Sequence, residues 1–161
     1  MVKPLAHGTI LEEGTSKALF THRLSTADLI DLAGVDATAH LFQQLIIDKV
    51  FEVRLTVVGR RVFAAALRSD SAAGQVDWRR DYSALRYRVI EPPDPVTKGV
   101  AAFMDEFGLN FGAFDFAVDT EGVWWFFECN SAGQFRFVEQ ATGLPITSAL
   151  ADLLEGARHD H

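Results

Sequence analysis

The stretch FGAFDFAVDTEGVWWFFECN, residues 111–130, decides the fold because it predicts a β-hairpin. Residues 111–118 and 123–128 are aromatic and β-branched runs, which favour strands. Between them, DTEG at residues 119–122 has the composition of a turn with glycine at its end. The antiparallel pairing that follows is the first indication of an α+β fold.

The hairpin carries three polar residues whose convergence depends on the length of the turn. With a four-residue turn, Asp115 lies opposite Phe126, and Glu128 and Asn130 share its face. Asp115 is then a diagonal neighbour of Glu128, about 5 to 8 Å away. An odd-length turn would destroy this arrangement.

Two carboxylates and an amide oxygen form a ligand set that suits a hard cation, and Mg²⁺ better than Zn²⁺. The pattern therefore predicts a metal site at Asp115, Glu128 and Asn130. A solvated hairpin face with incidental acids explains the local pattern equally well. By the same parity Cys129 points away from the site, into apolar packing.

Upstream, residues 51–58 alternate between apolar and polar side chains, as in a half-buried strand. Glu52, Arg54 and Thr56 share the face away from the core. Residues 59–61 form a polar break with a glycine, and residues 62–67 resume an apolar run, so a second antiparallel hairpin is expected.

Helices are expected at residues 25–33, 96–107, 134–141 and 146–154, each from its apolar spacing or its terminal signals. EPPDP at residues 91–95 must run as a loop. It separates a block at residues 1–90 from a block at residues 96–155 within a single unit spanning residues 1–161. The expected fold is α+β, with antiparallel sheets packed with helices.

Composition narrows the classes of function. A chain of 161 residues with 48% hydrophobic residues can fill one core. Its net charge of −7 argues against nucleic acid and anionic membranes as partners. A single cysteine and no signal or membrane segment make the cytoplasm the expected location.

The strings FGAFDF at 111–116 and WWFFECN at 124–130 resemble the C-terminal metal motif of ATP-grasp enzymes, and EVRLTVVG at 52–59 resembles their arginine-bearing strand. The nearest resemblance is to ATP-grasp ribosomal peptide maturases, the graspetide or microviridin-type cyclases, followed by the ribosomal-protein glutamate ligases. It rests on the strings DWRR at 77–80, GQF at 133–135, TGLPI at 142–146 and ALADLL at 149–154. The similarity runs from Val2 to Leu154, nearly the whole chain.

This resemblance implies a role for each candidate residue. Asp115, Glu128 and Asn130 would be the metal ligands, and Arg54 and Arg79 the catalytic arginines that neutralise developing charge. Nucleotide contacts would come from Lys3 at the phosphates, from Gln44, Leu45 and Ile46 at the adenine hinge, from Glu52 at the ribose and from Arg79 at the terminal phosphate or acyl phosphate.

The implied activity is that of an ATP-dependent carboxylate–amine or carboxylate–hydroxyl ligase with ATP and Mg²⁺, Mn²⁺ being the alternative ion, and a precursor peptide as substrate. The alternatives are a truncated domain that binds a peptide or partner without turnover, and a small-molecule carboxylate–amine ligase. The resemblance leads us to expect that the N-terminal half of an ATP-grasp fold is absent, and that either a missing N-terminal domain or a second copy completes the cleft. Ser131 stands where these motifs commonly continue with proline.

Overall fold

The computed structural model describes residues 1–4, 9–12, 14–18, 20–31, 35 and 39–156. The chain divides into two compact units, one of residues 1–47 with 69–85 and the other of residues 48–68 with 86–161. These units differ from the sequence blocks 1–90 and 96–155, because residues 48–68 pack with the C-terminal part of the chain.

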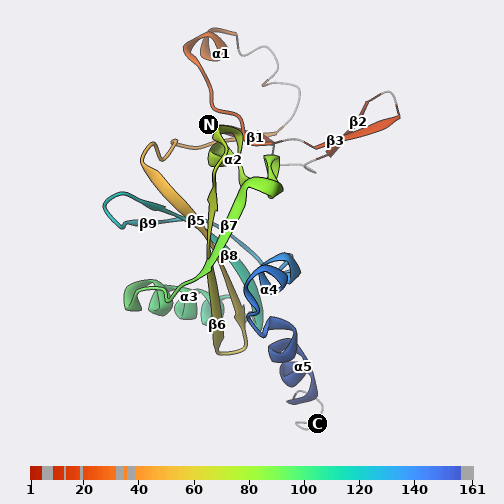
Figure 1. Ribbon diagram of the computed structural model, residues 1–161, viewed down its shortest axis with the longest axis vertical. Helices are drawn as coiled ribbons and strands as arrows, with labels where there is room; N and C mark the ends of the chain where they lie inside the picture. The colour runs from red at the N-terminus through yellow and green to blue at the C-terminus, as the bar shows by residue number, and fades with distance from the viewer. Residues whose placement is uncertain (5–8, 13, 19, 32–34, 36–38, 157–161) are drawn as a thin grey trace. The chain divides into compact units, whose positions relative to one another are not determined.

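The second unit is built on a five-stranded sheet in the order β7-β6-β5-β8-β9 (Figure 1). Its strands are β5 (Lys49–Val58), β6 (Arg61–Ser69), β7 (Leu85–Val89), β8 (Phe111–Asp119) and β9 (Trp124–Asn130). β5 pairs antiparallel with β6 and with β8, and β8 pairs antiparallel with β9. Both expected hairpins are confirmed, and they lie side by side through β5 and β8.

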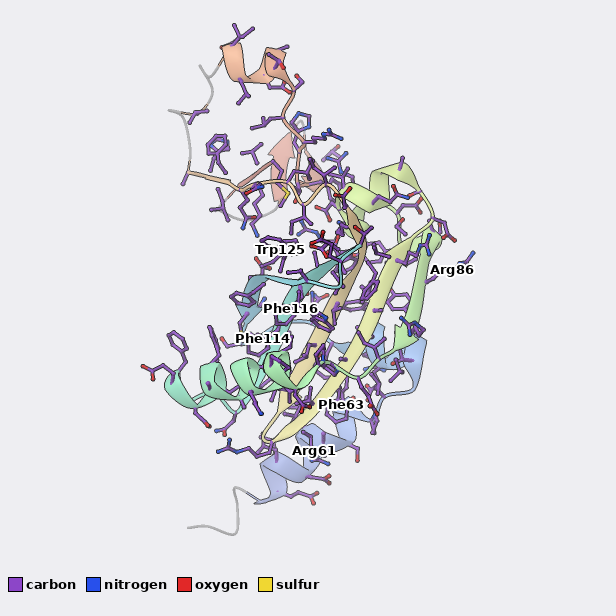
Figure 2. The ribbon with its side chains drawn as sticks, turned by 90° about the vertical axis from the view of Figure 1, so that its left-hand side faces the viewer. Arg61, Phe63, Arg86, Phe114, Phe116 and Trp125 are labelled. Carbon is purple, nitrogen blue, oxygen red and sulfur yellow. The ribbon has the colours of Figure 1, made fainter. Side chains whose placement is uncertain are left out.

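One face of this sheet packs against α3 (Asp94–Glu106) and forms the hydrophobic core. Val100 and Met104 of α3 meet Leu55 of β5 and Phe114 and Phe116 of β8. Figure 2 shows Phe114 and Phe116 on the side of the sheet where α3 lies. The alternation expected for residues 51–58 is confirmed, because the apolar set of β5 faces this core.

The opposite face is partly covered by α4 (Arg136–Thr142) and α5 (Ile146–Gly156) (Figure 1). Arg61, at the start of β6, donates hydrogen bonds to Asp152 and to the carbonyl of Ala149 at 2.8 Å each, which fastens α5 to the sheet. These helices cover one end of the face and leave the other end to polar side chains.

Helix α3 begins two residues before the expected start at residue 96. Pro95 lies in its first turn, where a backbone N–H has no partner within the helix, so a proline is tolerated there. The helix ends at Glu106, one residue short of the expected end, and Gly108 follows with a φ of 59°. Helices α4 and α5 lie within two residues of the expected bounds.

The first unit contains two small antiparallel sheets and several short helical elements. β1 (Val2–Pro4) pairs with β4 (His40–Phe42), and β2 (Thr9–Glu12) pairs with β3 (Thr15–Ala18). The helical elements are α1 (Thr26–Ile30), α2 (Ala72–Val76), η2 (Trp78–Arg80) and η3 (Tyr82–Ala84). None of the described helices has the length and apolar composition that a membrane span requires.

The expected helix at residues 25–33 is confirmed at its start. Ser25 caps α1, and the side chain of Asp28 closes the capping box by accepting from the Ser25 backbone N–H at 2.7 Å. The helix ends at Ile30, and residues 32–34 lie outside the described residues.

Candidate cation and phosphate site

The β8–β9 hairpin corrects the expected register while keeping its consequence. Val118 pairs with Trp124 and not with Val123, so the turn between them has five residues, 119–123. An odd turn alone would send Glu128 to the core face. A β-bulge between the pairs Phe116–Phe126 and Asp115–Glu128 takes up one extra residue, Phe127, and returns Glu128 to the face of Asp115. Glu128 therefore lies directly opposite Asp115, closer than the expected diagonal.

Asp115 also lies directly opposite Arg54 of β5, so three adjacent strands present one row of charged side chains. Arg54 Nε donates to Asp115 Oδ1 at 2.7 Å, and Arg54 Nη2 donates to Asp115 Oδ2 at 3.1 Å. The remaining terminal nitrogen, Nη1, donates to the carbonyl of Gln134 at 2.8 Å. The guanidinium also lies 5.4 Å from the ring centre of Phe137 on α4. Arg54, 9% exposed, is therefore held on three sides.

A second row, on the side of the hairpin turn, contains Glu52, Ala117 and Trp125 on the same three strands. Glu52 is half-buried and accepts a hydrogen bond from Lys49 Nζ. Trp125 is 46% exposed, and its indole Nε1 donates to Asp119 at 2.8 Å. Glu52 thus shares a face with Arg54, as the alternation predicted.

The third row contains Thr56, Ala113 and Asn130. Ala113 and Ala117 flank Asp115 along β8, and both are 0% exposed, so the carboxylate projects from between two small residues. The hydroxyl of Thr56 is buried without a hydrogen-bond partner among the described residues. On this face the Thr56 hydroxyl and the Asp115 carboxylate therefore lie beside the short side chains of Ala113 and Ala117.

The turn after β9 packs onto this row through a glycine. A Cβ on Gly133 would lie 2.5 Å from the Ala113 Cβ and 3.2 Å from the Asn130 carbonyl oxygen, so a side chain does not fit without a shift. Asn130 Oδ1 accepts from the Ala132 backbone N–H at 2.9 Å. The close approach of Gly133 brings the following carbonyl, that of Gln134, to Arg54.

The donor set fits a hard cation. Two carboxylates directly opposite each other on neighbouring strands repel unless positive charge lies between or beside them. Arg54 supplies positive charge beside Asp115, and a divalent cation would add positive charge beside both carboxylates. Among the described residues no group of three or more acidic, histidine or cysteine side chains gathers as a metal site, so Asn130 would supply the third protein oxygen. Asp115, Glu128 and Asn130 lie on adjoining rows, and their carboxylate and amide oxygens are of the kind that Mg²⁺ accepts.

The remaining candidate residues lie in the first unit. Lys3 is on β1, paired with Leu41, and residues 44–46 follow β4. Arg79 is in η2, and its guanidinium donates two hydrogen bonds to the Asp77 carboxylate. Arg79 Nε donates to Asp77 Oδ1 at 2.8 Å, and Arg79 Nη2 donates to Asp77 Oδ2 at 2.7 Å. The structure brings Glu52, Arg54, Asp115, Glu128 and Asn130 onto one face of the second unit. The roles of these residues stay predictions, as do those of Lys3, residues 44–46 and Arg79.

Asp77 is a residue of this region that the sequence interpretation did not assign. It is 5% exposed, and it also accepts from the Thr21 backbone N–H at 3.0 Å. Burial alone would raise its pKa, but the hydrogen bonds from Arg79 and Thr21 and the charge of Arg79 bring that pKa below its ordinary value. The sequence signal that could have singled out Asp77 is its position two residues before Arg79.

Cys129 packs where strand parity predicted. It pairs with Phe114 and lies against the hydrophobic core. Burial, followed by the negative charge of Asp115, raises the pKa of its thiol. A protonated, half-buried thiol is consistent with apolar packing.

Comparison with solved structures shows which proteins have a similar fold. The structure matches a RiPP-associated ATP-grasp ligase of Chryseobacterium gregarium, solved with ADP and a leader and core peptide, at 29% identity and a TM-score of 0.86 over 97% of this chain and 48% of that one. It matches the macrocyclase MdnC of Microcystis aeruginosa MRC, bound to the precursor peptide MdnA, at 30% identity and a TM-score of 0.82 over 97% of this chain and 49% of that one. The chain belongs to the ATP-grasp superfamily.

A more distant likeness supports the fold of this ATP-grasp chain. D-Alanine–D-alanine ligase of Bacillus anthracis, solved with ATP, matches with a TM-score of 0.56 and 14% identity over 99% of this chain and 54% of that one. The ATP-grasp chain described here spans about half the length of each of these three structures. No protein-family model and no curated protein matches the sequence.

Proposed function

We propose that this chain supplies the cation- and phosphate-binding part of an ATP-grasp ligase that joins a carboxylate of a precursor peptide to an amine or a hydroxyl. The observation that carries the proposal is the row of Arg54, Asp115 and Glu128, directly opposite one another on three adjacent strands. The peptide substrate is inferred from the similar ligases, which were solved with precursor, leader or core peptides.

The proposed reaction has two balanced steps. A carboxylate oxygen attacks the γ-phosphorus of ATP, which releases ADP and leaves an acyl phosphate. The amine or hydroxyl then attacks the acyl carbon, the proton passes to solvent or a base, and phosphate leaves. Both steps move negative charge between phosphate oxygens, so they need positioned positive charge more than a side-chain nucleophile.

The residues of the second unit divide this work. Asp115, Glu128 and Asn130 would hold Mg²⁺, which would neutralise negative charge on the phosphates. Arg54 is fixed by Asp115, Gln134 and Phe137, so it would present positive charge without reorganisation. Glu52, held by Lys49, would accept from ribose hydroxyls.

In the first unit, Lys3 and Arg79 would contact the phosphates, and the backbone of residues 44–46 would meet the adenine. These assignments rest on the family resemblance. A geometric observation also supports Arg79. Its guanidinium donates to both carboxylate oxygens of Asp77, which fixes its orientation, while the side chain stays 45% exposed.

Calorimetric titration with ADP tests the proposal. We expect ADP to bind only when Mg²⁺ is present, and we expect Asp115→Ala and Glu128→Ala each to weaken binding at least about tenfold. Asp105→Ala is the matched control, since Asp105 is an exposed acid of α3 whose ion pair with Arg60 lies at the surface. ADP binding that ignores both Mg²⁺ and these substitutions would refute the proposed site.

A second candidate function is a peptide-binding ATP-grasp chain without turnover. One observation favours it. Arg54 already donates to both carboxylate oxygens of Asp115, so this carboxylate has a partner within the chain when no cation is bound. Capture of a precursor peptide by the double variant Asp115→Ala/Glu128→Ala, undiminished from the wild type, together with no ADP release, would select this function over the first.

A further inference from the structure

The register of the β8–β9 hairpin is not selected by hydrophobic burial alone. In the observed register Trp124 and Phe126 face the core, where both rings contact Phe116, with ring centres 5.5 and 5.6 Å apart. Pairing Val118 with Val123 instead would turn Trp125 and Phe127 to that face, so either register turns two aromatic side chains toward the core face. Some other interaction must decide between them.

The choice determines whether Glu128 lies directly opposite Asp115 or only diagonal to it on the same face. In the alternative register, without a bulge, Asp115 lies opposite Phe126, and Glu128 moves along by one row to lie opposite Ala113. Only the observed combination of a five-residue turn and a bulge at Phe127 places Glu128 in the row of Asp115 and Arg54.

The hydrogen bonds of Asp119 depend on the observed register of the hairpin. Its Oδ1 accepts from the backbone N–H groups of Glu121 and Val123, at 2.9 Å each, which closes the five-residue turn. Its Oδ2 accepts from the Trp125 indole Nε1 at 2.8 Å. Asp119 lies on the same face of β8 as Asp115, so this bond requires Trp125 to be on that face too. In the alternative register Trp125 points to the core and the bond cannot form.

We propose that Asp119 is a positioning residue for the Asp115–Glu128 pair: it binds the turn amides and the Trp125 indole and thereby selects the five-residue turn, which together with the bulge at Phe127 puts Glu128 opposite Asp115. Asp119 does not itself contact the cation. The cation-binding part of this inference rests on the proposed function, whereas the register part is independent of it.

The test compares Asp119→Ala, Asp119→Asn and Trp125→Phe with Glu121→Ala, an exposed acid of the same turn, as the control. Mn²⁺ is the probe, followed by calorimetry on protein shown by circular dichroism to be folded. Asp119→Ala should weaken Mn²⁺ binding about tenfold, the lower end of what losing the support of a metal ligand costs, because the two carboxylates would then lie diagonal to each other. Asparagine keeps the turn contacts and loses the indole contact, so Asp119→Asn should be intermediate, and Trp125→Phe should resemble it.

A second measurement reads the register directly. Nuclear Overhauser contacts across the hairpin should join Asp115 to Glu128 in the wild type and shift toward Phe126 in Asp119→Ala. An Asp119→Ala protein that keeps both the wild-type contacts and wild-type Mn²⁺ affinity would overturn the inference. If Asp119→Ala fails to fold, Trp125→Phe decides in the same way.

The two proposals fail in different ways. If the wild-type protein does not bind Mn²⁺, the proposed function is refuted. The nuclear Overhauser contacts across the hairpin then still test the role of Asp119. A wild-type protein that binds Mn²⁺, with Asp119→Ala unchanged in both measurements, overturns the role of Asp119 alone.

Discussion

Arg54 and Asp115 are 61 residues apart in the chain, yet the guanidinium spans both carboxylate oxygens across the centre of the sheet. The pair is nearly dry, with 11% of the Arg54 side chain and 21% of the Asp115 side chain exposed. A pair in this setting stabilises the fold little by itself, but removing one partner leaves an uncompensated charge.

We expect Arg54→Gln to destabilise the protein by about 3 kcal/mol in urea unfolding, because Asp115 would lose the guanidinium that donates to both of its oxygens. Arg54→Lys should fall in between, since an ammonium group cannot span both oxygens and reach the Gln134 carbonyl. Arg60→Gln is the control: its ion pair with Asp105 is exposed and should contribute under about 1 kcal/mol. Equal losses in Arg54→Gln and Arg60→Gln would contradict this account.

Gly133→Ala should lower both stability and ADP affinity. The new methyl group would meet Ala113 at 2.5 Å, so the turn must move, and the Gln134 carbonyl would move away from Arg54 with it. Overpacking of this kind costs about 1–3 kcal/mol. Gly99→Ala on α3 is the matched control, because its Cβ meets nothing within 4 Å and the helix should gain about 0.5–1 kcal/mol. Thermal melts and calorimetry measure both effects, and Gly133→Ala melting at or above the wild type would disprove the packing argument.

Asp77 gives the first unit a dependence on acid. Its pKa is lower in the folded protein than in the unfolded chain, so its stabilisation is complete above the unfolded value, near pH 4. It is lost as pH falls through the folded pKa. Asp77→Asn should therefore be less stable at pH 7 and should show a smaller loss of stability between neutral and acid pH. Urea unfolding at a series of pH values checks this, and parallel curves for the two proteins would rule it out.

Cys129 should react slowly with thiol reagents. Burial and the charge of Asp115 raise the pKa of its thiol, which lowers the thiolate fraction at neutral pH. We expect the rate of reaction with a disulfide reagent at pH 7.5 to rise on unfolding in urea. Asp115→Asn removes one of the two causes and should speed the native reaction slightly. A native rate equal to the unfolded rate would show that the thiol is not protected.

The sequence predicted the faces of β5 well, because apolar and polar residues alternate from Phe51 to Val57. It failed on the register of β9 for a physical reason: Trp124, Trp125, Phe126 and Phe127 are all apolar, so no alternation marks the face of each residue or shows which one is extra. β7 was missed although Leu85, Tyr87 and Val89 alternate with two arginines, a pattern that does predict a strand.

The charged row was only half predictable. Parity could place Arg54 on one face of its strand, but Glu128 shares a face with Asp115 only because a bulge compensates for the odd turn, and neither feature was predicted. The mutual register of β5 and β8 depends on pairing between distant segments. The hold on Arg54 by the Gln134 carbonyl could not be foreseen, because a backbone oxygen carries no signature in the residue type. The family resemblance suggested the roles of these residues, and the structure shows that Arg54, Asp115 and Glu128 lie directly opposite one another on three strands.

The position of Arg54 and Asp115 on two adjoining inner strands has a consequence for how the protein opens. β5 and β8 each have paired strands on both sides, so their amide hydrogens can exchange with solvent only when the whole sheet separates. Hydrogen exchange at these two residues should therefore be among the slowest in the chain. The charged row would then belong to the last part of the molecule to unfold, unlike sites built on mobile loops.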